Sequence, residues 1–136
     1  MMSGRRPNER TIADGAGARI VVLQNADGTC EVVEFLELLA NDRPKDFAKI
    51  QALIDRVKEI GPQNVKNTER VKPLGDGLFE LKAHQIRVLW IYGATEGSKR
   101  KVVLLEGLIK KRDRHRPSDL ERARKLKIAY ERGTEA

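Results

Sequence analysis

The sequence predicts an α+β fold: a first strand, a helical hairpin, three antiparallel strands that join the first strand in one sheet, and a C-terminal helix. Apolar residues repeat with a helical period between residues 29 and 60, and the period becomes two after residue 71. A segment that begins with proline and has a weak helical stripe closes the chain. A chain of 136 residues suits one domain with a modest core.

The N-terminal residues are expected to contribute little regular structure. Residues 1–18 mix Gly, Arg, Asn and Pro without periodicity, which predicts a flexible basic arm. The segment RIVVLQ at 19–24 is rich in β-branched residues and ends at the turn signal NADG, so it predicts the first strand. We therefore expect one folded domain at 19–131.

Two amphipathic helices are predicted next. In TCEVVEFLELLAN (29–41), apolar residues fall at helical spacing and three Glu residues lie on the other side. A second helix begins at Pro44, which the first turn of a helix tolerates, and Gly61-Pro62 ends it. Short helices of this kind need tertiary packing, so we expect an antiparallel hairpin with one face buried.

Three strands and a final helix follow. A Gly-Asp-Gly turn leads into LFELK. Alternation along this strand places Phe79 and Leu81 on one face and Glu80 and Lys82 on the other. QIRVLWIY (85–92) and RKVVLLEGLI (100–109) are the second and third strands of the set. The last helix starts at Pro117. The spacing of Ser118 and Glu121 within it predicts a capping box.

Positive charge is concentrated in the C-terminal part of the chain. The net charge is +7, and residues 98–127 alone hold twelve of the 27 Lys and Arg but only four of the 20 acids. The rest of the chain is nearly neutral. An anionic partner is therefore favoured over a neutral one, with RNA as the natural candidate.

Several classes of protein are disfavoured. Cys30 is the only cysteine, so neither an internal disulfide nor a Cys-based metal cluster is expected, and the two His residues lie far apart in sequence. We predict no metal and no cofactor. The start MMSGRRPNER lacks the apolar stretch of a secretory signal, and no segment approaches the roughly 20 apolar residues of a membrane span. We expect no membrane partner and a cytoplasmic location.

The segments LGDGLFELK, IRVLWIY and VVLLEGLIKK, followed by a helix that starts with proline, resemble the HigB-like branch of the RelE toxin superfamily, which has many phage-derived members. The resemblance spans roughly residues 19–130. It implies the toxin of a type II toxin–antitoxin system, an endoribonuclease (mRNA interferase) that cuts mRNA on the ribosome without a metal. It also implies a cognate antitoxin protein as partner.

The resemblance also implies site residues. Arg87 matches the basic residue that opens the second strand of the hairpin, and Lys82 matches the basic residue that ends the strand before it. Lys110 and Lys111 match the basic pair after the last strand. Relatives often carry a Tyr or His near the C-terminus as an acid or base, and the nearest residue of that kind here is His115.

These residue types suit cleavage of RNA by its own 2′-hydroxyl. Lys and Arg stabilise the charge that develops on the phosphate, and the Arg87 fork fits two phosphate oxygens. A lysine crowded by other cations loses its proton more easily and can act as a base, while imidazole serves near neutral pH without help. Further cations are expected to bind RNA: Arg112, Arg114, Arg116, Lys99 and Arg100.

Two alternatives remain open. The first is a RelE-like module that keeps the fold without catalysis and binds nucleic acid or protein. The second is a structural or regulatory protein without affinity for nucleic acid. The localised positive charge disfavours the second alternative. If the chain is a toxin, we expect an acidic or amphipathic element of the antitoxin to lie against the basic cleft.

Overall fold

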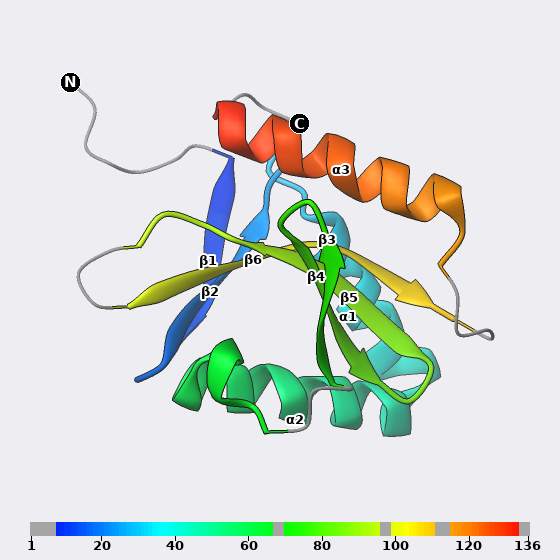
Figure 1. The fold of residues 1–136 in the computed structure, drawn as a ribbon. Coiled ribbons are helices and arrows are strands. Elements are labelled where there is room, and N and C mark those ends of the chain that lie inside the picture. Colours follow the sequence, from blue (N-terminus) through cyan, green and yellow to red (C-terminus); the bar gives the residue numbers. More distant parts are fainter. Residues whose placement is uncertain (1–7, 67–69, 96–98, 111–114, 134–136) are drawn as a thin grey trace.

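The computed structural model describes residues 8–66, 70–95, 99–110 and 115–133, which form one six-stranded sheet covered on both faces (Figure 1). Two helices cover one face and the C-terminal helix lies across the other. The elements are β1 (Glu9–Asp14), β2 (Ala18–Leu23), α1 (Glu31–Asp42), α2 (Pro44–Ile60), a 3₁₀ turn (Pro62–Asn64), β3 (Val71–Gly75), β4 (Leu78–Ala83), β5 (Ile86–Tyr92), β6 (Arg100–Ile109) and α3 (Pro117–Arg132).

The strands are arranged in the order β1-β2-β6-β5-β4-β3, and only β2 and β6 pair in parallel. The predicted fold class is confirmed, because the strand at 18–23 joins the later antiparallel set in one sheet by pairing with β6. The structure adds a strand at each edge that the sequence did not predict. β3 precedes the Gly-Asp-Gly turn, and β1 lies next to β2.

Strand β1 shows that the prediction of a flexible arm was wrong for residues 9–14. Its side chains are mostly exposed, so it lacks the apolar alternation by which strands are recognised. Tertiary contacts hold it instead. Glu9 accepts a hydrogen bond from the hydroxyl of Tyr130 on α3 at 2.6 Å, and it also pairs with the buried ammonium of Lys101 on β6 at 3.0 Å. Residues 1–7 lie outside the described residues.

The helical hairpin covers one face of the sheet as predicted. Pro44 occupies the first turn of α2, and Gly61, with φ of 87°, ends the helix in a conformation that only glycine adopts easily. Both helices turn apolar side chains toward β2, β4, β5 and β6. This core includes Leu36, Leu39, Ile50, Leu53, Ile54, Ile20, Leu81, Val88, Trp90 and Leu104.

The C-terminal helix α3 covers the opposite face through a narrow contact. Within the helix only Ala123 and Tyr130 are buried, above a cluster from the sheet: Val21, Leu23, Leu78, Leu89, Ile91, Val103 and Leu105. Tyr130 is 3% exposed and packs in the interior. The predicted capping box is wrong, because Arg116 is the N-cap residue and Ser118 already lies inside the first turn.

Gly107 on β6 lets α1 approach the sheet closely, and this generates the first prediction. A Cβ atom at this position would overlap the ring of Phe35 on α1. We expect Gly107→Ala to destabilise the fold by about 1–3 kcal/mol in urea unfolding, because the helix and strand must separate. In a Phe35→Ala background the same change should cost little. An equal loss in both backgrounds would contradict the steric explanation.

Candidate active site

Polar side chains gather on the α3 side of β4, β5 and β6, beside the start of α3. Glu80 and Lys82 share this face with Leu78, whereas Phe79 and Leu81 pack toward the helical hairpin, as the alternation predicted. Across the strands, Lys82 lies opposite Arg87, which in turn lies opposite Leu108. The next row is Glu80, Leu89 and Glu106. Pairing of the strands therefore places several charged groups in two neighbouring rows.

Arg87 is buried, and its side chain is occupied by contacts within the chain. The residue is 4% exposed, and Nη1 donates hydrogen bonds to the carbonyl oxygens of His84 at 2.6 Å and Ile86 at 3.2 Å. Its Nε lies 3.9 Å from Glu80 Oε1. His84 has a φ of 55°, which is uncommon for a residue with a side chain. Arg87 thus secures the β4–β5 turn and balances the charge of Glu80.

His115 and Glu80 form a buried pair that the sequence did not predict. His115 Nε2 is hydrogen-bonded to Glu80 Oε1, and both side chains are at most 8% exposed. The other ring nitrogen, Nδ1, is buried and has no hydrogen-bond partner among the described residues. His115 was a candidate from the sequence, but Glu80 was not. The alternation of the predicted strand, which places Glu80 on the same side as Lys82, was the signal that could have identified Glu80.

Lys110 lies on the same side of the sheet as Arg87. Its backbone N–H donates to Gln85 O at 2.7 Å, and its buried ammonium lies 3.4 Å from Asp119 Oδ2 in the first turn of α3. Two residues earlier, Leu108 lies opposite Arg87 and packs in the cluster beneath α3. Lys82 is half-buried beside them. The structure thus brings together four of the five candidate catalytic residues.

The other predicted cations are dispersed or undescribed. Lys99 and Arg100 lie at the far end of the ten-residue strand β6, about 30 Å from Lys110. Lys99 pairs with Asp14 at 2.7 Å, and the Arg100 guanidinium lies 4.4 Å from the centre of the Tyr92 ring. Arg116 is exposed at the start of α3. The remaining three candidates, Lys111, Arg112 and Arg114, lie outside the described residues.

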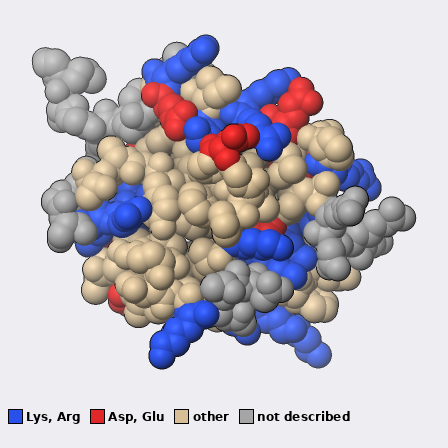
Figure 2. Space-filling model, viewed as in Figure 1, with Lys and Arg blue, Asp and Glu red and all other residues tan. Residues whose placement is uncertain are grey.

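Much of the C-terminal positive charge is paired with acids. Figure 2 shows Lys and Arg interleaved with Asp and Glu along the top of the molecule, where α3 lies in Figure 1. The pairs include Lys125 with Glu121 and Lys127 with Glu131 on the helix itself, and Arg124 with Asp76 from the β3–β4 turn. Exposed pairs of this kind are weak and exchange readily, so they lower the local charge without removing the cations from solvent.

Glu106 is a second buried acid on this face. Burial raises its pKa to about 7, and the negative charges of Asp119 and Glu31 act in the same direction, while the Arg122 guanidinium opposes them. Arg122 Nε lies 3.5 Å from Glu106 Oε1, and the same guanidinium binds Glu31 on α1. Glu106 Oε2 has no hydrogen-bond partner within the described part of the chain. Arg122 thus joins α3 to β6 and α1.

The described residues contain neither a group of three or more His, Cys, Asp or Glu that could hold a metal ion nor a helix long and apolar enough to span a membrane.

Residues 34–127, more than half of the chain, match the family described as Phage derived protein Gp49-like (DUF891). The chain belongs to the Gp49-like family.

Gp49-like proteins form a RelE/HigB-like toxin family, so a general toxin function and an antitoxin partner follow for this Gp49-like chain. The match covers most of α1, most of α3, everything between these helices and every candidate residue of the site, but not β1 or β2. No curated protein matches the sequence.

The buried contacts of Arg87 generate a prediction for the Gp49-like chain. Arg87→Met should lower the free energy of unfolding by about 2–4 kcal/mol, because it leaves the charge of Glu80 and the carbonyl of His84 without their partner. Urea unfolding measures this loss. The matched control is Arg70→Met, at an exposed arginine, which should change stability by less than about 0.5 kcal/mol. Equal stability of the two variants would refute the structural role of Arg87.

The raised pKa of Glu106 generates a prediction about pH. In the folded chain the Glu106 carboxyl keeps its proton up to about pH 7, whereas in the unfolded chain it loses the proton near pH 4.5. Protonation of Glu106 therefore favours folding at low pH, and this contribution to stability is lost as the pH rises from about 4.5 to 7. Glu106→Gln should therefore be about 2–3 kcal/mol more stable than the parent at pH 8 and nearly equal at pH 4.5. Urea unfolding at both pH values tests this. A gain of the same size at both would contradict it.

Proposed function

We propose that this chain is the toxin of a type II toxin–antitoxin pair, in the HigB-like branch of the RelE superfamily, and that it cleaves mRNA on the ribosome. RNA supplies its own nucleophile, the 2′-hydroxyl, so the reaction needs a base, an acid and stabilisation of the charged phosphate rather than a metal. The family supports a toxin in general. The chemistry of the site supports the particular reaction.

The buried Glu80–His115 pair is the observation that carries the proposal. A carboxylate that accepts a hydrogen bond from Nε2 fixes the imidazole tautomer and leaves the lone pair on Nδ1. Nδ1 has no hydrogen-bond partner among the described residues, and it is therefore suited to accept a proton from a 2′-hydroxyl. Nδ1 is buried in the free chain, so the proposal includes a local rearrangement that lets RNA reach it.

Cations beside this pair have separate roles in the proposal. The Lys110 ammonium contacts the Asp119 carboxylate at 3.4 Å, and a phosphate oxygen can take the place of Asp119. Further phosphate contacts would come from four neighbouring cations, Lys111, Arg112, Arg114 and Arg116. Arg87 is better suited to position Glu80 than to clamp a phosphate, because its guanidinium already contacts two carbonyl oxygens.

A binding module without catalysis is the second candidate, and specific contacts favour it. Arg87 is 4% exposed, and the Lys110 ammonium is already paired with Asp119. If these groups only stabilise the fold, the chain would bind nucleic acid through its exposed cations alone. Its affinity would then fall steeply with salt, and no cleavage product would form.

Cleavage of mRNA on translating ribosomes, mapped by primer extension, tests the proposal. Expression of the parent should arrest growth, and His115→Ala and Glu80→Gln should each slow cleavage by about 10²–10⁴-fold, the usual contribution of an acid or base. Lys125→Ala removes an exposed cation of α3 and should cleave at the parental rate. Urea unfolding of each variant checks that the fold persists. Parental rates in both site variants would exclude this catalytic pair, and the absence of any product from the parent would favour the binding module.

A further inference from the structure

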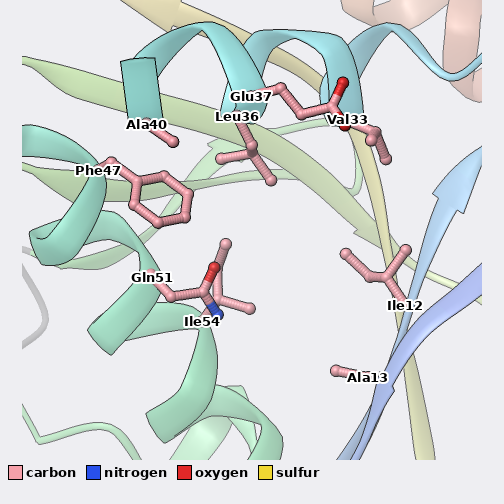
Figure 3. Close-up of a pocket in the computed structure, with 9 residues that line it drawn as sticks. All are labelled: Ile12, Ala13, Val33, Leu36, Glu37, Ala40, Phe47, Gln51 and Ile54. Atoms are coloured by element: carbon pink, nitrogen blue, oxygen red, sulfur yellow. The ribbon is translucent and has the colours of Figure 1, made fainter. Parts of the chain in front are cut away.

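An apolar groove opens on the side of the molecule that carries the helical hairpin. It has a volume of about 300 Å³, and Figure 3 shows α1, α2 and β1 turning side chains into the same space. Its lining is apolar except for two residues, Glu37 and Gln51. The lining residues are Ile12, Ala13, Val33, Leu36, Glu37, Ala40, Phe47, Gln51 and Ile54.

The groove is open along part of its length. Ile12 is 38% exposed, Ala40 is exposed, and Val33 and Phe47 are half-buried. Ile12 lies where the pairing of β1 with β2 shifts register, so it is the extra residue of a bulge. The groove is thus a concave, mostly apolar surface that a side chain of another molecule can enter.

Charge around the groove restricts the chemistry of its occupant. Helix α1 contains four acids, Glu31, Glu34, Glu37 and Asp42, and no Lys or Arg, although the whole chain has a net charge of +7. Glu37 is the charged residue of the lining. Glu37 is exposed, so an occupant that covers it is favoured when it places a positive group beside this carboxylate, because an unpaired carboxylate is costly to bury.

The shape indicates a helix as the occupant. Seven of the nine lining residues come from α1 and α2, so an amphipathic helix that lies between them packs as a third helix against the hairpin. The groove lies on the face of the sheet opposite to α3, and thus opposite to the Glu80–His115 pair. An occupant of the groove leaves that pair uncovered.

We propose that this groove anchors the antitoxin through an amphipathic helix whose apolar side enters the groove and whose Lys or Arg contacts Glu37. The identity of the partner rests on the proposed function, whereas the chemistry of the helix rests on the groove. The contact is distinct from the acidic element expected over the basic cleft. An antitoxin that uses both would hold the toxin from two sides.

Binding of the purified chain to the protein encoded by the adjacent reading frame tests the proposal by isothermal titration calorimetry. Glu37→Lys reverses the charge of the lining, and Ala40→Arg fills the groove from an exposed helical position. Each should raise Kd at least tenfold and reduce neutralisation of growth arrest. Glu34→Lys on α1 and Ala52→Arg on α2 are matched controls at exposed positions outside the lining, and they should bind as the parent does.

The outcomes separate this proposal from the proposed function. Parental affinity in both groove variants would overturn the groove as the anchor. A parent that is dimeric in light scattering, and that Glu37→Lys makes monomeric, would also overturn it, because the occupant would then be a second copy. Toxicity in the absence of the partner is measured separately. If the parent is not toxic but the groove variants still bind the partner at least tenfold more weakly than the parent does, only the toxin function is refuted.

Discussion

The two central strands, β5 and β6, are buried on both faces, and this constraint requires a covering layer on each side of the sheet. The helical hairpin supplies one layer with a broad apolar surface. The other layer is a single helix, α3, in which only Ala123 and Tyr130 are buried. The second layer is therefore incomplete, and the part of the sheet beside the start of α3 is closed by polar groups instead.

Compensation of charge determines how those polar groups are arranged. Glu80 contacts His115 and Arg87, Lys110 contacts Asp119, and Glu106 contacts Arg122. Burial of charge is costly even when partners are present, so such clusters are poor devices for stability alone. Perturbed ionisable groups occur preferentially at functional sites, and the pKa of about 7 at Glu106 fits that tendency. The same contacts explain why Arg87 serves the fold as well as any reaction.

The sheet also separates two surfaces with different chemistry. The α3 side carries buried ionisable groups and a cation-rich segment, whereas the hairpin side carries an apolar groove beside an acidic helix. A partner in the groove and RNA at the other face would not compete for space. Because the β-sheet between them is closely packed, communication between the two surfaces would have to pass through contacts such as that of Arg122, which joins α3 to both β6 and α1.

Local patterns in the sequence determined most of the fold. The helical period set α1 and α2, Pro44 and Gly61 set the limits of α2, and alternation set the faces of β4. These features follow from neighbours within a few residues, which is why they can be read without a structure. Strand β1 could not be predicted in this way, because its position depends on contacts of Glu9 with Lys101 and Tyr130, which are distant in the sequence.

The candidate site was divided in the same way. The family resemblance and the residue types selected Arg87, Lys110 and His115 as chemically capable, and alternation along β4 already indicated which way Glu80 points. Only the tertiary structure decided that Glu80 is hydrogen-bonded to His115, that Asp119 pairs with Lys110, and that Arg87 donates to backbone carbonyl oxygens. The reason is physical. A charge that leaves water takes whichever partner the packing of distant elements brings within reach, and no local pattern specifies that partner.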